Sequence, residues 1–169
     1  MNRVEINIRQ RVGDLVKAIC AKDIDRVMSF YAPDVVSFDI TPPLRYVGAD
    51  RKRRAWQEAF AALSGPIAYD VRDLNVTTQG ELAFVHSLNH IDATLPGGHI
   101  DRWLRWTACF RQINGAWLVV HDHVSVPVDP VRGQAESHPF RWEGTMNTDY
   151  GNQHATGRRD AWRRECRSL

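Results

Sequence analysis

The spacing of apolar residues predicts three helices and a short strand in the first part of the chain. Residues 4–19 carry apolar side chains at intervals of three and four, the period of an amphipathic helix. Asp23 is a typical N-cap for a second, short helix that ends at residues 32–34. Residues 35–40 are typical of a short strand, and residues 48–63 repeat the helical period.

Four strands separated by turn residues are predicted after the third helix. They cover residues 69–78, 82–94, 99–113 and 116–126, and the last two are joined by Asn114-Gly115, a strong hairpin signal. A group of helices followed by an antiparallel meander predicts an α+β fold.

The periodicity stops at Pro127, after which proline, glycine, serine and asparagine become frequent. We therefore expect one domain over residues 1–128. Residues 129–169 are expected to be a C-terminal extension, an arm or a partly disordered segment. The excess of positive charge lies within this C-terminal segment. The net charge is +2, and residues 156–169 contribute five arginines against two acids, which leaves the rest nearly neutral. A nucleic-acid partner is therefore not expected.

Three cysteines, widely spaced, give no metal-binding pattern and no disulfide framework. No apolar run approaches the roughly 20 residues that a membrane helix needs. The first ten residues carry charges where a signal peptide would have its apolar stretch. We expect no membrane partner and a cytoplasmic location.

Two stretches resemble the nuclear transport factor 2-like superfamily, which includes ketosteroid isomerases and SnoaL-like polyketide cyclases. The first is Phe30–Asp39 (FYAPDVVSFD), and the second is Asn114–Ser125 (NGAWLVVHDHVS). The second also resembles the association domain of a calcium/calmodulin-dependent protein kinase. The resemblance implies a cystatin-like cone, in which N-terminal helices pack against a curved antiparallel sheet around a pocket.

In the ketosteroid isomerase pattern, an aspartate eight residues after the tyrosine is the general base, and Tyr31 and Asp39 have this spacing. A carboxylate in an apolar cone is poorly solvated, which favours proton transfer. The alternative is an aspartate that caps the following turn. The two oxyanion donors of that family fall at Leu15 and Leu104, which cannot donate hydrogen bonds. A ketosteroid isomerase reaction is therefore not expected.

Histidines are candidates for the missing acid. His86 and His90 share one face of the strand at 82–94 because their separation is even. An inward His86 could pair with Asp39, whereas the alternative is a structural histidine. His121 and His123 are expected on the convex face, near a dimer interface rather than a metal.

The remaining candidates are expected to line the pocket. Trp106 shares the face of Leu104, and turn counting also turns Asp122 inward as a second carboxylate. The expected lining residues are Tyr31, Phe38, Trp56, Phe60, His90, Leu104, Trp106, Val120 and Asp122. Core packing is the alternative for each aromatic residue. Residues 51–54 (RKRR) are interpreted as a solvated helix face.

Two functions from different classes remain open. One is a cofactor-free and metal-free isomerase, cyclase, dehydratase or hydrolase that moves a proton on a small apolar carbonyl compound, with Asp39 and His86 as catalytic residues. The other is a ligand-binding or oligomerisation module like the kinase association domain. In both cases we expect a homodimer that pairs through the convex face of the sheet.

Overall fold

A computed structural model describes residues 2–135. The expected extension over residues 129–169 therefore lies mostly outside the described residues. Within them, three helices precede most of the sheet, as predicted: α1 (Arg3–Cys20), α2 (Ile24–Met28) and α3 (Ala49–Ala62). Asn2 and Asp23 cap the first two helices, because their side chains accept hydrogen bonds from backbone amides three residues later.

The six strands of the described residues form one sheet in the order β2-β1-β6-β5-β4-β3. The bounds are β1 (Tyr31–Phe38), β2 (Tyr46–Val47), β3 (Ser64–Gln79), β4 (Leu82–Leu95), β5 (Gly98–Ile113) and β6 (Ala116–Ser125). The four long strands form the expected meander. The Asn114-Gly115 turn has positive φ at both residues, as a two-residue hairpin loop prefers.

The sheet departs from the prediction along β1. The second helix ends at Met28, so Tyr31 begins a strand rather than closing a helix. This strand runs parallel to β6, and its register shifts between Tyr31 and Val36, a segment that accommodates Pro33. The short strand β2, which pairs with β1, has no clear periodicity in the sequence.

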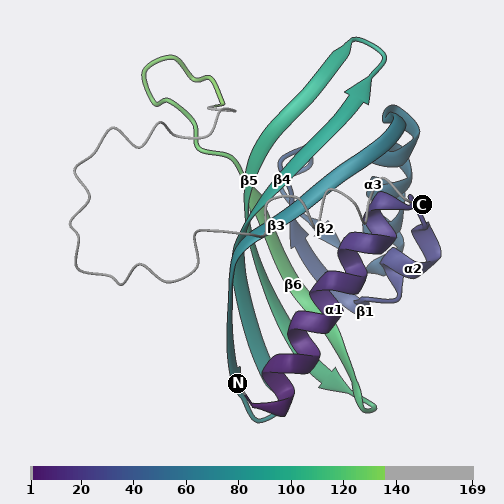
Figure 1. The fold of residues 1–169 in the computed structure, drawn as a ribbon, viewed down its shortest axis with the longest axis vertical. Helices are drawn as coiled ribbons and strands as arrows, with labels where there is room; N and C mark the ends of the chain where they lie inside the picture. Colours follow the sequence, from purple (N-terminus) through teal and green to yellow (C-terminus); the bar gives the residue numbers. More distant parts are fainter. Residues whose placement is uncertain (1, 136–169) are drawn as a thin grey trace, which may run out of the picture.

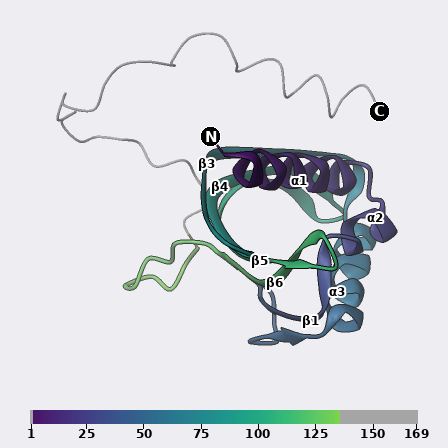
Figure 2. The same ribbon diagram turned by 90° about the horizontal axis from the view of Figure 1, so that it is seen from below.

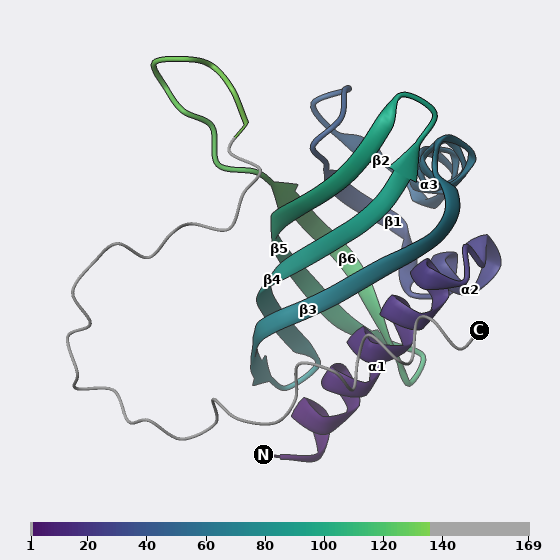
Figure 3. The ribbon, with the colours of Figure 1, turned by 45° about the horizontal axis from the view of Figure 1, so that its top comes forward.

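The sheet curves around the helices, as the cone prediction requires. In Figure 2 the strands form an arc, with α1 closing one side next to β3 and with α2 and α3 closing another. Figures 1 and 3 show α1 running obliquely across the concave face. The core lies between α1 and the inward residues of the sheet, including Ile8, Val85 and Val119, each 0% exposed.

Two bulges set which side chains face the inside of the arc. In β6, Phe110 pairs with Val119 and Cys109 with His121, so Val120 is an extra residue. In β3 the register shifts between Arg72 and Asn75, where Asp73 has a positive φ of 53°. Each bulge reverses the alternation of inward and outward positions along its strand.

Among the described residues, no helix combines the length and hydropathy that crossing a membrane requires.

Candidate functional site

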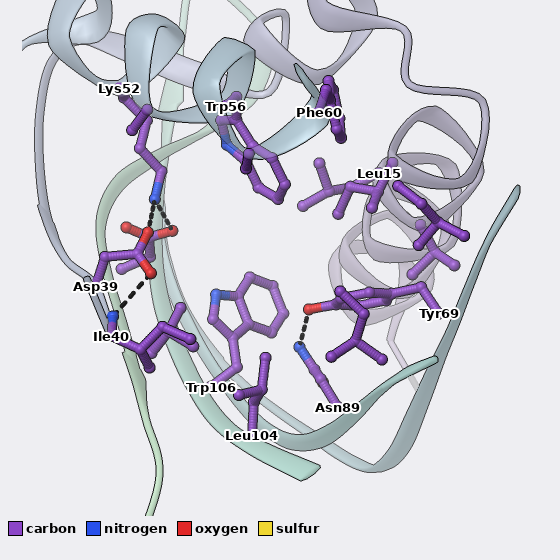
Figure 4. Close-up of a pocket in the computed structure, with 18 of the residues that line it drawn as sticks. Leu15, Asp39, Ile40, Lys52, Trp56, Phe60, Tyr69, Asn89, Leu104 and Trp106 are labelled. Carbon is purple, nitrogen blue, oxygen red and sulfur yellow. Dashed lines mark hydrogen bonds and ion pairs between the residues drawn. The ribbon is translucent and has the colours of Figure 1, made fainter. Parts of the chain in front are cut away.

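The arc encloses a cavity of ≈190 Å³ between α1, α3 and the sheet. Most of its lining is apolar. The contributions are Val12, Leu15, Val16 and Ile19 from α1; Ala55, Trp56, Ala59 and Phe60 from α3; and Leu104 and Trp106 from β5. Figure 4 shows Trp56 and Phe60 across the open space from Leu104 and Trp106, with Leu15 next to Phe60. Such a lining favours an apolar ligand with few polar groups.

One wall carries a charged group that we call the Lys52 cluster, made of Tyr31, Ser37, Asp39, Lys52 and Asp122. Lys52 is 2% exposed, and its Nζ donates to Ser37 Oγ at 2.8 Å and to Asp39 Oδ2 at 3.0 Å. Asp122 Oδ2 lies 3.6 Å from the same ammonium. Two carboxylates therefore share one buried cation, which offsets the cost of desolvating the charges.

The buried carboxylate of Asp122 is held by two partners. Tyr31 Oη donates to Asp122 Oδ2 at 3.2 Å, whereas Oδ1 has no hydrogen-bond partner among the described residues and almost no exposed surface. Burial, together with the negative charge of Asp122, raises the pKa of Tyr31 well above its usual value. Tyr31 is therefore a neutral donor at physiological pH.

Asp39 is the accessible carboxylate of the Lys52 cluster. Its side chain is 24% exposed, compared with 2% for that of Asp122. Its Oδ1 accepts the backbone amide of Ile40 at 2.8 Å, so the carboxylate is fixed from two sides (Figure 4). Each oxygen keeps a lone pair that a ligand could approach.

Two further polar residues of the lining, Tyr69 and Asn89, form with Ser87 behind them a chain of three neutral side chains, which we call the Tyr69 chain. Ser87 Oγ donates to Asn89 Oδ1 at 2.7 Å, and Asn89 Nδ2 donates to Tyr69 Oη at 2.9 Å. Figure 4 shows the Tyr69 hydroxyl at the cavity, close to the amide of Asn89. Burial raises the pKa of Tyr69 to about 12, so its phenol also stays protonated.

Seven of the predicted site residues line the cavity. They are Tyr31, Asp39, Trp56, Phe60, Leu104, Trp106 and Asp122. The structure brings Asp39 and Asp122 together on one cation, which the sequence did not indicate. What each of these residues does chemically stays a prediction.

His86 does not face the cavity, so the predicted Asp39–His86 dyad is wrong. The inward positions of β4 are the odd ones, including Val85, Ser87 and Asn89, and His86 is exposed on the outer face. His90 lies on the same outer face, where its Nε2 is 2.6 Å from Asp101 Oδ1 and its ring stacks on Trp103.

Phe38 and Val120 are also outside the cavity lining, contrary to the prediction. Phe38 is 37% exposed and packs edge-on against His121 and His123 on the outer face of the sheet. Val120 is the extra residue of the β6 bulge, so Val119 is inward before it and Asp122 after it. The predicted alternation of β6 therefore holds at Asp122, after the bulge, and fails on the stretch before it.

Sequence reasoning missed Lys52, Tyr69 and Asn89. Lys52 was interpreted as part of a solvated run, yet it precedes Trp56 and Phe60 by four and eight residues and therefore lies on the apolar stripe of α3. The helical period was the signal that could have found it. Asn89 likewise shares the parity of the buried residues Ala83 and Val85.

Comparison with known proteins places this geometry in a family. A model of the SnoaL-like domain matches residues 8–129. The chain is similar to a nuclear transport factor 2-like protein of unknown function from Pseudomonas putida KT2440, at 28% identity and a TM-score of 0.75, over 81% of this chain and 96% of that one. No curated protein matches the chain.

Two further solved structures share the fold at lower identity. A ketosteroid isomerase-like protein from Erwinia carotovora atroseptica has 22% identity and a TM-score of 0.65, covering 74% of this chain and 97% of that one. A protein of unknown function with a cystatin-like fold from Nostoc punctiforme has 13% identity and a TM-score of 0.64, covering 77% and 95%. These likenesses confirm the predicted cone.

Proposed function

The chain belongs to the SnoaL-like domain family, and we propose that it catalyses cofactor-independent proton transfer on a small apolar carbonyl compound held in the cavity. Isomerisation, cyclisation and dehydration can each begin with such a step, whereas in hydrolysis the base would take its proton from water. The observation that carries the proposal is a carboxylate, Asp39, fixed by a buried ammonium at the wall of an apolar cavity.

Asp39 is the proposed base. Its accessible carboxylate takes a proton from the carbon next to the carbonyl. The C–H bond breaks, its electron pair forms a carbon–carbon double bond, and the carbonyl π pair moves to oxygen. Asp122 is the less suitable base because its unpartnered Oδ1 has almost no surface that a ligand could touch. Its charge instead helps to hold Lys52 beside Asp39.

The size of the cavity supports a substrate of one or two rings. An engineered apolar cavity of about 150 Å³ binds benzene, and the cavity here measures ≈190 Å³. A bicyclic ketone such as indan-2-one is therefore a suitable probe. Its carbonyl makes the neighbouring protons acidic enough to exchange with solvent.

The test measures proton abstraction directly, without knowledge of the natural reaction. The protein is incubated with indan-2-one in deuterium oxide, and loss of the α-proton signal is followed by NMR. We expect exchange above the buffer rate, and we expect Asp39→Asn to reduce the protein-dependent rate by about 10²–10⁴-fold, the usual contribution of a general base.

The matched control is Asp34→Asn, on the same strand. The Asp34 side chain is 73% exposed and outside the cavity lining, so this variant should exchange at the wild-type rate. Exchange that survives in Asp39→Asn would remove the base assignment. Binding of indan-2-one without exchange above the buffer rate would favour a ligand-binding module instead.

A further inference from the structure

We propose that Tyr69 is the hydrogen-bond donor for the carbonyl oxygen of the ligand, and that the Tyr69 chain forms an acceptor-oxygen subsite on the sheet wall of the cavity. This inference rests on the proposed function for the ligand class, which it narrows to compounds that have an acceptor oxygen and an acidic carbon within one small apolar body.

The direction of the hydrogen bonds along the Tyr69 chain carries the proposal. Ser87 donates to the amide oxygen of Asn89, and the amide nitrogen donates to Tyr69 Oη. The phenol oxygen is thus an acceptor within the chain, so its own proton is directed to another partner. The cavity that Tyr69 lines is where that partner can sit.

The chain also makes Tyr69 a better donor. Consecutive hydrogen bonds polarise one another, and a phenol that accepts a hydrogen bond donates more strongly through its own proton. Ser87 and Asn89 are 5% and 3% exposed, so water competes little for their bonds. With a pKa of about 12, Tyr69 keeps its proton across the physiological range and cannot serve as the base.

Tyr69 would supply the donor that this chain lacks at Leu15 and Leu104. When Asp39 removes the proton, negative charge develops on the carbonyl oxygen, and a donor already aimed at that oxygen stabilises it. The proton that Asp39 holds then returns to a carbon of the same compound, so no oxidant or second reactant is needed.

The experiment compares a ketone with the hydrocarbon of the same shape. Indan-2-one and indane are titrated against the full-length protein and followed by tryptophan fluorescence, since Trp56 and Trp106 line the cavity. Tyr69→Phe should weaken the binding of indan-2-one by about 3- to 10-fold, which is the contribution of a neutral hydrogen bond. The affinity for indane should not change.

Infrared spectroscopy reports on the hydrogen bond to the carbonyl itself. If Tyr69 only packed against the ligand, the frequency of the carbonyl stretch would not change. The carbonyl stretch of bound indan-2-one should lie at lower frequency in the wild type than in Tyr69→Phe. Asn89→Asp should abolish the shift too, because a carboxylate only accepts hydrogen bonds and would turn the Tyr69 proton toward itself. Tyr46→Phe is the control, since that hydroxyl donates to Pro42 O outside the cavity.

Equal losses of ketone and hydrocarbon affinity, an unchanged carbonyl stretch in Tyr69→Phe, or no binding of the ketone would each overturn the inference. The outcome is separable from that of the proposed function. A shifted carbonyl without proton exchange keeps the subsite and removes the catalysis. Asp39-dependent exchange with an unshifted carbonyl stretch keeps the catalysis and removes the subsite.

Discussion

Buried polar atoms without a hydrogen-bond partner occur both at the cavity and away from it. Within residues 2–135 they are Asp122 Oδ1, Trp56 Nε1, Arg11 Nε and Arg102 Nε. Each such atom costs about 1–3 kcal/mol of stability. Asp122 and Trp56 line the cavity, whereas Arg11 and Arg102 do not. At Asp122 this cost falls next to Asp39, the residue at which ligand chemistry is proposed.

Single pocket residues were predictable where only one face of an element is apolar. Trp106 and Ala108 alternate with Arg105 and Thr107, and Leu104 shares their parity, so its direction follows from the strand period. His86 was not predictable in this way, because β4 has apolar residues on both faces: Ala83 and Val85 inward, Phe84 and Leu88 outward. When both faces of a strand carry apolar residues, the alternation alone does not show which face points inward.

Raising the pH above 10 should destabilise the protein through Tyr69. Its pKa is raised from 10 to about 12 on folding, so the unfolded chain releases this proton first and stability falls as the pH rises between these values. The loss from Tyr69 is at most about 2–3 kcal/mol. Urea unfolding at pH 8–11.5 should show that the free energy of unfolding falls less steeply with pH in Tyr69→Phe than in the wild type. Identical slopes for the two proteins would contradict the assignment.

At the scale of elements, α3 is attached to the body by a buried ion-pair cluster as well as by apolar contacts, since Ala49, Trp56 and Phe60 pack against the core. Lys52 is its only buried residue, and Arg53 adds an ion pair to Asp25 at 2.7 Å. The apolar stripe of the helix, which includes Trp56 and Phe60, faces the cavity and stays partly exposed. The position of α3 therefore depends on the ion pairs of Lys52 as well as on this apolar packing.

Replacing Lys52 should consequently reduce the stability of the protein more than is usual for a lysine in a run of charged residues. Lys52→Met leaves Asp122 as an unpaired buried charge, which typically costs about 3–5 kcal/mol. Urea denaturation should report this loss, and the double variant Lys52→Met/Asp122→Asn should recover part of it because the orphaned charge is gone. Arg54→Met, on the exposed face of the same helix, should stay within about 0.5 kcal/mol of wild type.

The number and order of the long elements followed from the sequence, while their irregularities did not. The helical period found α1 and α3, and the Asn114-Gly115 turn fixed the last hairpin. The bulges in β3 and β6 depend on pairing with neighbouring strands, which the local pattern does not record. The parallel pairing of β1 with β6 is a long-range contact of the same kind.

At the scale of the whole molecule, the curved sheet has an apolar outer face as well as an apolar cavity. Leu82, Phe84 and Leu88 are 58%, 45% and 41% exposed, and they lie on the outer side of β4, with His86 between Phe84 and Leu88. Large apolar residues grouped on a surface favour association. This arrangement supports the expected homodimer, which stays a prediction, as does the domain boundary at residue 128.

Phe84→Asp should therefore convert a dimer into a monomer, because a carboxylate placed in an apolar interface loses its hydration without gaining a partner. Light scattering at micromolar concentration would measure the change in mass, with circular dichroism confirming that the fold is kept. Arg54→Asp is the control, because Arg54 lies on the exposed face of α3 and not on the sheet. A wild-type protein that is monomeric at this concentration would contradict the expectation.

The bulge at Val120 has a consequence for how relatives are compared with this chain. Because β6 carries one extra residue there, Asp122 is inward although it lies three positions, rather than two or four, after the inward Val119. A relative whose last strand is regular must be aligned with a gap at Val120. Without that gap, the counterpart of Asp122 would be matched to His121, and a buried carboxylate would be recorded as an outward-facing histidine.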